Sequence, residues 1–155
     1  MLKRWLKYLP AGLLLAAVVL VLAWLMRPRS FAEFAPAEHV AEVYLYTTSV
    51  HVDGHELYEA WPDREEVEPL LNLLEPGMLR FKSRSRQIEW EPEETLFHLA
   101  FVCEQEDGRT EVVGIDLCTD GMVYIHHSWL GFIGYRLSCD MDAIESELMR
   151  LLGIA

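Results

Sequence analysis

Basic residues are scarce once the first 29 residues are passed. Residues 30–155 contain eight Lys and Arg against 25 Asp and Glu, so eight minus 25 leaves this part of the chain a formal charge of −17. A surface of that sign repels phosphate backbones, which excludes general nucleic-acid binding as a function. The same charge also keeps a protein soluble and dispersed.

Cysteines are few as well, and the motifs of common enzymes are missing. The three cysteines, Cys103, Cys118 and Cys139, include no C-x-x-C pair and lack the spacing of a zinc ribbon. One disulfide could form outside the cytoplasm, but small buried thiols are the simpler interpretation. The chain has no G-x-S-x-G, no Walker loop, no G-x-G-x-x-G and no H-E-x-x-H. We therefore assign no catalytic residue and expect no cofactor.

One long apolar run is present near the N-terminus. Residues 9–26, "LPAGLLLAAVVLVLAWLM", are 18 residues without a charge, and as a helix they would span roughly 27 Å, near the thickness of a hydrocarbon core. Three cations precede the run within residues 1–8, and Arg27 and Arg29 follow it. This imbalance favours a cytoplasmic N-terminus. The sequence predicts a single-pass cell-membrane protein with a basic cytoplasmic segment (1–8), a transmembrane helix (9–26) and an outer domain.

A cleaved signal peptide, followed by secretion, is the alternative to an anchor. Small residues at 30–32 (SFA) and 35–37 (APA) have the spacing that a signal peptidase needs. The apolar run is longer than a usual signal core, and two arginines separate it from both sites, so we favour the uncleaved anchor. Residues 27–39 are polar with two prolines, which predicts a linker that holds the domain off the membrane.

Residues 40–155 are predicted to form one extracytoplasmic α+β domain. Asp-Gly pairs at 53–54, 107–108 and 120–121 interrupt segments rich in β-branched and aromatic residues. Glycine tolerates the positive φ of tight turns, so these pairs predict three hairpins. Because the helical segments do not alternate with the strands, we expect an antiparallel sheet of hairpins with two helices packed on one face.

The two helices are predicted from capping residues and apolar spacing. Asp63 and Glu66 fit a capping box. The apolar residues that follow at helical spacing are Val67, Leu70, Leu71 and Leu74. Pro69 would cost an interior hydrogen bond, so this helix is expected to begin nearer Glu66. In the last helix, Asp140 and Asp142 favour the N-terminal end. Its apolar face comprises Met141, Ile144, Leu148, Leu151 and Leu152.

Two segments of the domain carry a resemblance to known proteins. They are "WPDREEVEPLLNLLE" and "TEVVGIDLCTDGMVYI", with an apolar anchor before them and a helix after them. In pattern and order, most of residues 40–152 resembles small membrane-anchored or secreted domains of unknown function from Gram-positive bacteria. The resemblance implies an extracytoplasmic α+β domain. It implies no catalytic residues.

A cluster of cations occupies residues 79–88, "LRFKSRSRQI". In a strand, side chains alternate with period two, which would place four cations on one face. These are Arg80, Lys82, Arg84 and Arg86. We interpret Lys82, Arg84 and Arg86 as a contact strip for an acidic patch or an anionic group of a partner. Two alternatives remain open, namely charges that deter edge-to-edge pairing and pairing with nearby acids.

Histidines and aromatic residues offer weaker candidates. His51 and His55 could be metal ligands, but a turn at 53–54 places them on opposite hairpin arms, so no metal site is predicted. Trp129, Phe132 and Tyr135 could line a pocket, although packing in the core is the favoured interpretation.

Three functions remain open. The favoured one is a membrane-anchored binding domain that meets another envelope protein or an exposed ligand. The second is a hydrolase, metal-dependent or not, that uses histidines and carboxylates. The third is a structural or assembly role in which the anchor matters more than the domain surface.

Overall fold

A computed structural model of the chain describes residues 9–48, 57–83, 95–105, 107–127 and 131–154. Its elements, with η for a short 3-10 helix, are α2 (Leu9–Met26), β1 (Arg29–Ser30), η1 (Phe31–Glu33), η2 (Ala37–His39), β2 (Val40–Thr48), β3 (Leu57–Ala60), α3 (Arg64–Leu74), β4 (Met78–Ser83), β5 (Leu96–Glu104), β6 (Thr110–Cys118), β7 (Met122–His127), β8 (Gly131–Ser138) and α4 (Met141–Leu152). The predicted α+β class and the order of strands and helices in the domain are confirmed.

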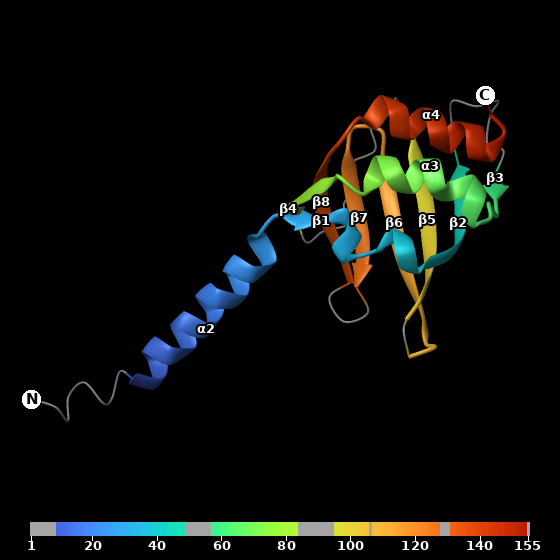
Figure 1. Cartoon of the computed structure of the whole chain (residues 1–155). Helices are drawn as coiled ribbons and strands as arrows, with labels where there is room; N and C mark the ends of the chain where they lie inside the picture. The colour runs from blue at the N-terminus through green and yellow to red at the C-terminus, as the bar shows by residue number, and fades with distance from the viewer. Residues whose placement is uncertain (1–8, 49–56, 84–94, 106, 128–130, 155) are drawn as a thin grey trace, which may run out of the picture.

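The strands form one antiparallel sheet that curls like half a barrel (Figure 1). Across the described residues it has eight strands in the order β1-β4-β8-β7-β6-β5-β2-β3. Strands β5, β6 and β7 each pair with the next strand along the chain. Two predicted turns lie here, where Gly108 and Gly121 have φ values of 77° and 86°. Strands β2 and β3 also pair as predicted, while the turn predicted at residues 53–54 lies outside the described residues.

Helix α3 begins directly after Asp63, the residue predicted to cap it. The Asp63 carboxylate accepts hydrogen bonds from the amides of Glu65 and Glu66, both at 2.9 Å. Glu66 Oε2 accepts one from the Asp63 amide at 3.1 Å. These bonds satisfy N–H groups of the first turn, so the helix starts at Arg64, and the expected start nearer Glu66 is wrong. Pro69 lies inside the helix, where burial of the neighbouring apolar face offsets its missing hydrogen bond.

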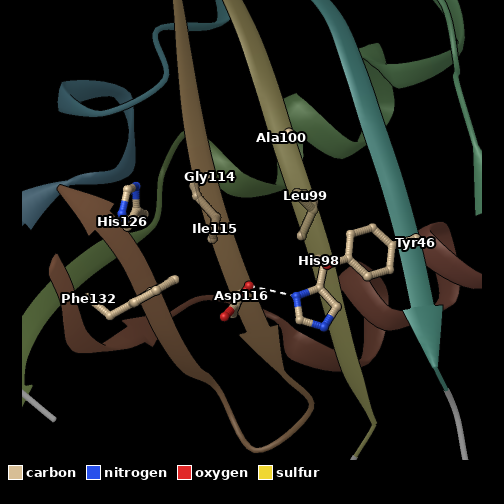
Figure 2. A pocket seen from close by; sticks show the side chains of 9 residues that line it. All are labelled: Tyr46, His98, Leu99, Ala100, Gly114, Ile115, Asp116, His126 and Phe132. Carbon is tan, nitrogen blue, oxygen red and sulfur yellow. Dashed lines mark hydrogen bonds and ion pairs between the residues drawn. The ribbon is translucent and has the colours of Figure 1, made fainter. Parts of the chain in front are cut away.

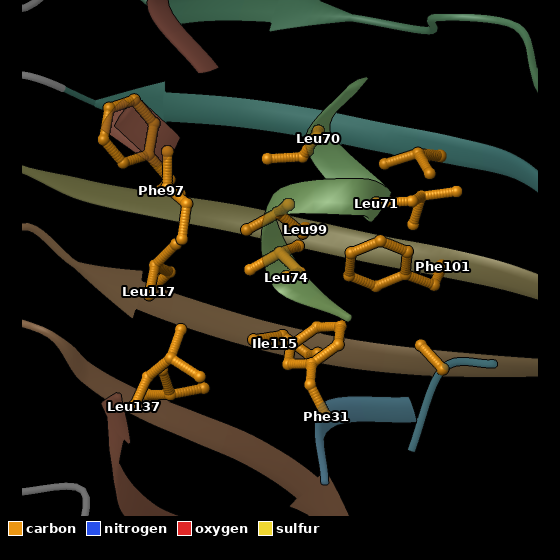
Figure 3. Packing of buried hydrophobic residues seen from close by; sticks show 14 of the residues in the cluster. Phe31, Leu70, Leu71, Leu74, Phe97, Leu99, Phe101, Ile115, Leu117 and Leu137 are labelled. Carbon is orange, nitrogen blue, oxygen red and sulfur yellow. The ribbon is translucent and has the colours of Figure 1, made fainter. Parts of the chain in front are cut away.

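Helices α3 and α4 lie side by side over one face of the sheet, as predicted (Figure 1). Side chains from alternate strand positions meet the apolar faces of both helices in one core. Figure 3 shows this packing around the leucines of α3. The predicted apolar residues of α3 are all buried, and Ile144, Leu148 and Leu152 of α4 are buried with them. Met141 and Leu151 are partly buried at the margin of the core. Among the described helices, none covers the opposite face of the sheet.

The residues between α2 and β2 pack into the domain, which differs from the linker predicted over residues 27–39. Strand β1 pairs with β4 at the edge of the sheet. Phe31 is only 2% exposed, and its ring meets that of Phe101 edge-on, with the centroids 5.9 Å apart. Burial of this apolar surface stabilises the segment against the sheet. The folded domain therefore begins at Arg29 rather than at residue 40, and two residues separate it from α2.

Helix α2 projects from the domain beside β1 and β4 (Figure 1). Its exposed large apolar side chains are Leu13, Leu14, Leu15, Val18, Val19, Leu20, Val21, Leu22, Trp24 and Met26. Within the described residues, we find no helix that combines the length and the apolar character needed to cross a membrane. The described part of the chain leaves these apolar side chains uncovered.

Candidate binding site on the uncovered face of the sheet

The uncovered face of the sheet has a hollow near its centre (Figure 2). Ala100 of β5 and Gly114 of β6 lie opposite each other there. Because both residues are small, a volume of about 280 Å³ is left open above the strands. Larger polar and aromatic residues surround the hollow, namely Tyr46, His98, Asp116, His126 and Phe132. We call this feature the outer-face hollow.

His98 and Asp116 form a hydrogen-bonded pair at one side of the outer-face hollow. The register of β5 and β6 places the two residues directly opposite each other. His98 Nδ1 lies 2.7 Å from Asp116 Oδ1, and the side chains are only 15% and 9% exposed. The carboxylate fixes the orientation of the imidazole, so the second ring nitrogen, Nε2, is the atom that can meet a ligand.

A row of stacked rings continues from His98 along the same face. The Tyr46 ring stacks on the imidazole with centroids 4.3 Å apart and an interplanar angle of 12°. Tyr44 follows at 5.5 Å from Tyr46, and Trp61 stacks on Tyr44 at 4.2 Å. The hydrogen bond from the Tyr44 hydroxyl to Glu59 raises the pKa of Tyr44, which keeps this hydroxyl protonated. The row holds the imidazole plane in place and offers a flat aromatic surface.

The histidines do not form a metal site in the part of the chain that the structure describes. No three His, Cys, Asp or Glu side chains there lie close enough together to hold an ion. His51 and His55, the candidates from the sequence, lie outside the described residues. His126 lies at the far side of the outer-face hollow, with its ring 4.9 Å from that of Phe132. The expectation that the protein uses no cofactor stays a prediction.

The predicted cationic strip is only partly described. Arg80 and Lys82 of β4 are both exposed, as that prediction requires. Arg84 and Arg86 lie outside the described residues. Arg80 stands opposite Arg136 of β8. Neither described cation of β4 lines the outer-face hollow.

The aromatic residues of the last hairpin are divided between the two faces. Tyr135 is buried in the core at 1% exposure, which confirms the predicted packing for this ring. Phe132 instead lines the outer-face hollow and packs against a smaller buried cluster of Leu96, Cys118 and Tyr124, so it packs as predicted but outside the core between sheet and helices. The two residues lie three positions apart in β8, and period-two alternation puts them on opposite faces. Trp129 lies outside the described residues.

No disulfide joins Cys103, Cys118 or Cys139, as the simpler interpretation predicted. Cys103 and Cys118 are buried in strands, and Cys139 is partly buried after β8. Burial, reinforced by the nearby Asp140 carboxylate, raises the pKa of Cys139 to about 11.

Alkylation of Cys139 should therefore be slow at neutral pH. At pH 8 its thiolate fraction is about 100-fold below that of an ordinary cysteine, so iodoacetamide should react about 100-fold more slowly with the folded chain than with the unfolded chain. The rate should rise as the pH approaches 11. Peptide mapping identifies the modified cysteine. If Cys139 of the folded chain reacts at pH 8 as fast as Cys139 of the unfolded chain, its partly buried position beside Asp140 is wrong.

Comparison with known proteins does not place the chain in a family. No protein-family model, curated protein or solved structure matches it significantly. The resemblance to small anchored domains of Gram-positive bacteria stays a prediction.

Proposed function

We propose that the chain is a single-pass membrane-anchored binding domain that takes its ligand in the outer-face hollow. The observation that carries the binding proposal is the pair of His98 and Asp116, held partly buried beside an open volume. Concave sites that combine apolar walls with a few fixed polar groups are the usual form of small-ligand sites. Here Tyr46 and Phe132 supply the apolar walls.

The polar groups indicate what kind of ligand fits. The bond between His98 Nδ1 and Asp116 Oδ1 leaves Nε2 of His98 as the polar atom for a ligand. The ligand should therefore bring a hydroxyl or amino group, which can donate or accept a hydrogen bond there. Its ring or other flat face would lie against the aromatic side chains. The negative charge of residues 30–155 makes an anionic ligand unfavourable at this site.

Hydrolysis is the second candidate, because a histidine oriented by a carboxylate can act as a general base. Among the described residues, the side chains that line the outer-face hollow include no Ser, Thr, Cys, Lys or Arg, and their one hydroxyl is the phenol of Tyr46. The described lining thus has the base and its orienting partner, without a Ser, Thr or Cys nucleophile and without a cationic group to stabilise an oxyanion. Binding is for this reason the better-supported function.

Filling the outer-face hollow should abolish binding. A Cβ added at Gly114 would lie 3.7 Å from the Cβ of His126, an ordinary contact, so Gly114→Ala is tolerated while Gly114→Leu extends into the hollow. Hexoses and aromatic amines would be screened against the full chain by saturation-transfer NMR. We expect Gly114→Leu and His98→Ala to weaken any hit at least about tenfold, since each removes contacts worth 1.4 kcal/mol or more.

The matched control for this experiment is Gly114→Ala, which changes the same backbone position and leaves most of the volume open. It should bind like the unmodified chain, and thermal unfolding would verify that Gly114→Leu is folded. Hits that bind Gly114→Leu and His98→Ala unchanged would place the site elsewhere. A panel without any hit would argue against this ligand class.

The anchor is proposed from the sequence of α2 and from the exposure of its described side chains. Apolar side chains at 13–15 and 18–22 are exposed, and consecutive residues of a helix point in all directions around its axis. A bilayer would cover all sides at once, and the basic residues before the run favour a cytoplasmic N-terminus with the domain outside. A partner protein of the envelope is the other possible cover. No described helix meets the requirement for a span.

The packing of Phe31 favours an anchor over a cleaved signal peptide. Cleavage after the small residues at 30–32 would remove β1 and Phe31 from the folded domain, and cleavage after 35–37 would also remove the buried Ala35. Either product would lose part of its core. An uncleaved chain keeps this segment in place.

A further inference from the structure

We propose that the exposed cations of β4, Arg80 and Lys82, contact anionic phospholipid head groups where α2 leaves the domain. This inference rests on the proposed anchoring. The partner proposed for Arg80 and Lys82 is a membrane surface. Its phospholipid head groups contain a phosphate diester and carry a net negative charge.

The first observation is the position of β4 beside the end of α2. In the antiparallel pair of β1 and β4, Arg29 lies opposite Leu79 and Ser30 lies opposite Met78. Each step along β4 beyond Leu79 therefore runs back toward the residues that precede Arg29. Lys82 lies three residues beyond Leu79, or about 10 Å at 3.3 Å per residue. Backbone contacts between α2 and β4 confirm that the two elements are neighbours (Figure 1).

The second observation is that the junction has no loose linker. The Arg29 guanidinium lies 4.1 Å from the centre of a Trp24 ring, so the last turn of α2 contacts the first strand of the domain. Arg27 Nη2 bonds to Glu33 Oε2 at 2.8 Å across the same junction. Contacts on both sides of Pro28 hold the domain against the end of the helix. If α2 lies in a bilayer, the edge of the sheet at β4 must lie near the head groups.

The third observation concerns charge. Arg80 and Lys82 are exposed, and among the described residues neither has an acidic side chain within ion-pair distance. Arg80 stands opposite Arg136, and like charges in that position repel each other. Arg136 bonds to Asp120 at 3.1 Å and so has its own acidic partner. An anion from outside the chain would neutralise Arg80, while the acidic remainder of the domain would be repelled by the same membrane.

Hydrogen exchange at β4 tests this contact in the full chain. The protein would be placed in vesicles of phosphatidylcholine alone and in vesicles with one-third phosphatidylglycerol, and exchange would be measured for residues 78–83. A basic residue near an anionic surface raises the affinity for that surface by on the order of tenfold or somewhat less. We therefore expect phosphatidylglycerol to slow hydrogen exchange at β4 by about tenfold. Arg80→Glu or Lys82→Glu should remove most of that difference.

The matched control is Arg109→Glu, which makes the same change of charge at an exposed position in the turn between β5 and β6. In this variant, exchange at β4 should still be slower in vesicles with phosphatidylglycerol than in vesicles of phosphatidylcholine alone. If a glutamate variant alters exchange in phosphatidylcholine alone, the milder Arg80→Gln and Lys82→Gln replace it, and they should lose about half of the effect.

The outcomes separate this inference from the anchoring on which it rests. A chain that does not co-float with either kind of vesicle contradicts the anchor. A chain that co-floats with both, and exchanges at β4 equally in both, contradicts the head-group contact alone. If Arg109→Glu removes the difference between the two lipids as fully as the β4 variants do, the difference depends on the net charge of the domain. That result would also contradict the head-group contact.

Discussion

Replacing Phe31 with alanine is expected to lower the free energy of unfolding by about 3–5 kcal/mol. Phe31 is 2% exposed and meets the ring of Phe101 at 5.9 Å between centroids. The substitution removes a buried ring and leaves a cavity under the sheet, and the two losses add. Denaturant unfolding of the full chain in detergent, followed by tryptophan fluorescence, measures the change.

The control for Phe31→Ala is Leu57→Ala, at a leucine that is 57% exposed on the edge strand β3. An exposed site of this kind should change stability by no more than about 0.5 kcal/mol. If Phe31→Ala were as mild as Leu57→Ala, residues 29–35 would be the polar connector that composition predicts. A large loss would establish that the folded domain begins directly after α2.

Placing two arginines in α2 should abolish membrane insertion. Leu15 and Val19 are 66% and 55% exposed near the middle of the helix. An arginine at the centre of a membrane helix costs about 2.5–3.5 kcal/mol on insertion scales, so the double substitution Leu15→Arg and Val19→Arg should cost about 5–7 kcal/mol. Co-flotation of the full chain with phosphatidylcholine vesicles measures the loss.

The control is Val112→Arg, which introduces the same side chain at a 62% exposed position on β6. It should float with the vesicles like the unmodified chain. Retained flotation of the double-arginine chain would mean that α2 is not the membrane contact, and its apolar surface would then need another cover.

Local signals in the sequence predicted most of the fold. The capping pair of Asp63 and Glu66 and the apolar spacing after it specify α3, because both act within one or two turns. The Asp-Gly turns at 107–108 and 120–121 specify hairpins for the same reason. For residues 27–39 the overall polarity predicts a linker, and the pairing of β1 and the burial of Phe31 show that this prediction is wrong. The aromatic residues Phe31 and Phe34 of this segment were the signal for packing against the sheet.

The binding site was harder to predict, because its residues come together only through the register in which the strands pair. His98 and Asp116 are 18 positions apart, and only the pairing of β5 with β6 brings them within 2.7 Å. A signal did exist. His98 is the one histidine of the apolar segment "LFHLAFVC", and Asp116 is the one acid of the apolar segment "VVGIDLC". A polar side chain in such a place needs a partner, and two such strands joined by a short turn could have suggested the pair.

Alkaline extraction of the unmodified full chain tests membrane anchoring most directly. Membranes that contain the protein would be washed with sodium carbonate at high pH, which releases proteins held by surface contacts and retains those inserted in the bilayer. We expect the chain to stay with the membranes, with its acidic domain accessible to protease from the outer side. Release of the whole chain into the supernatant would contradict the anchor, and the apolar surface of α2 would then have to be covered by another protein.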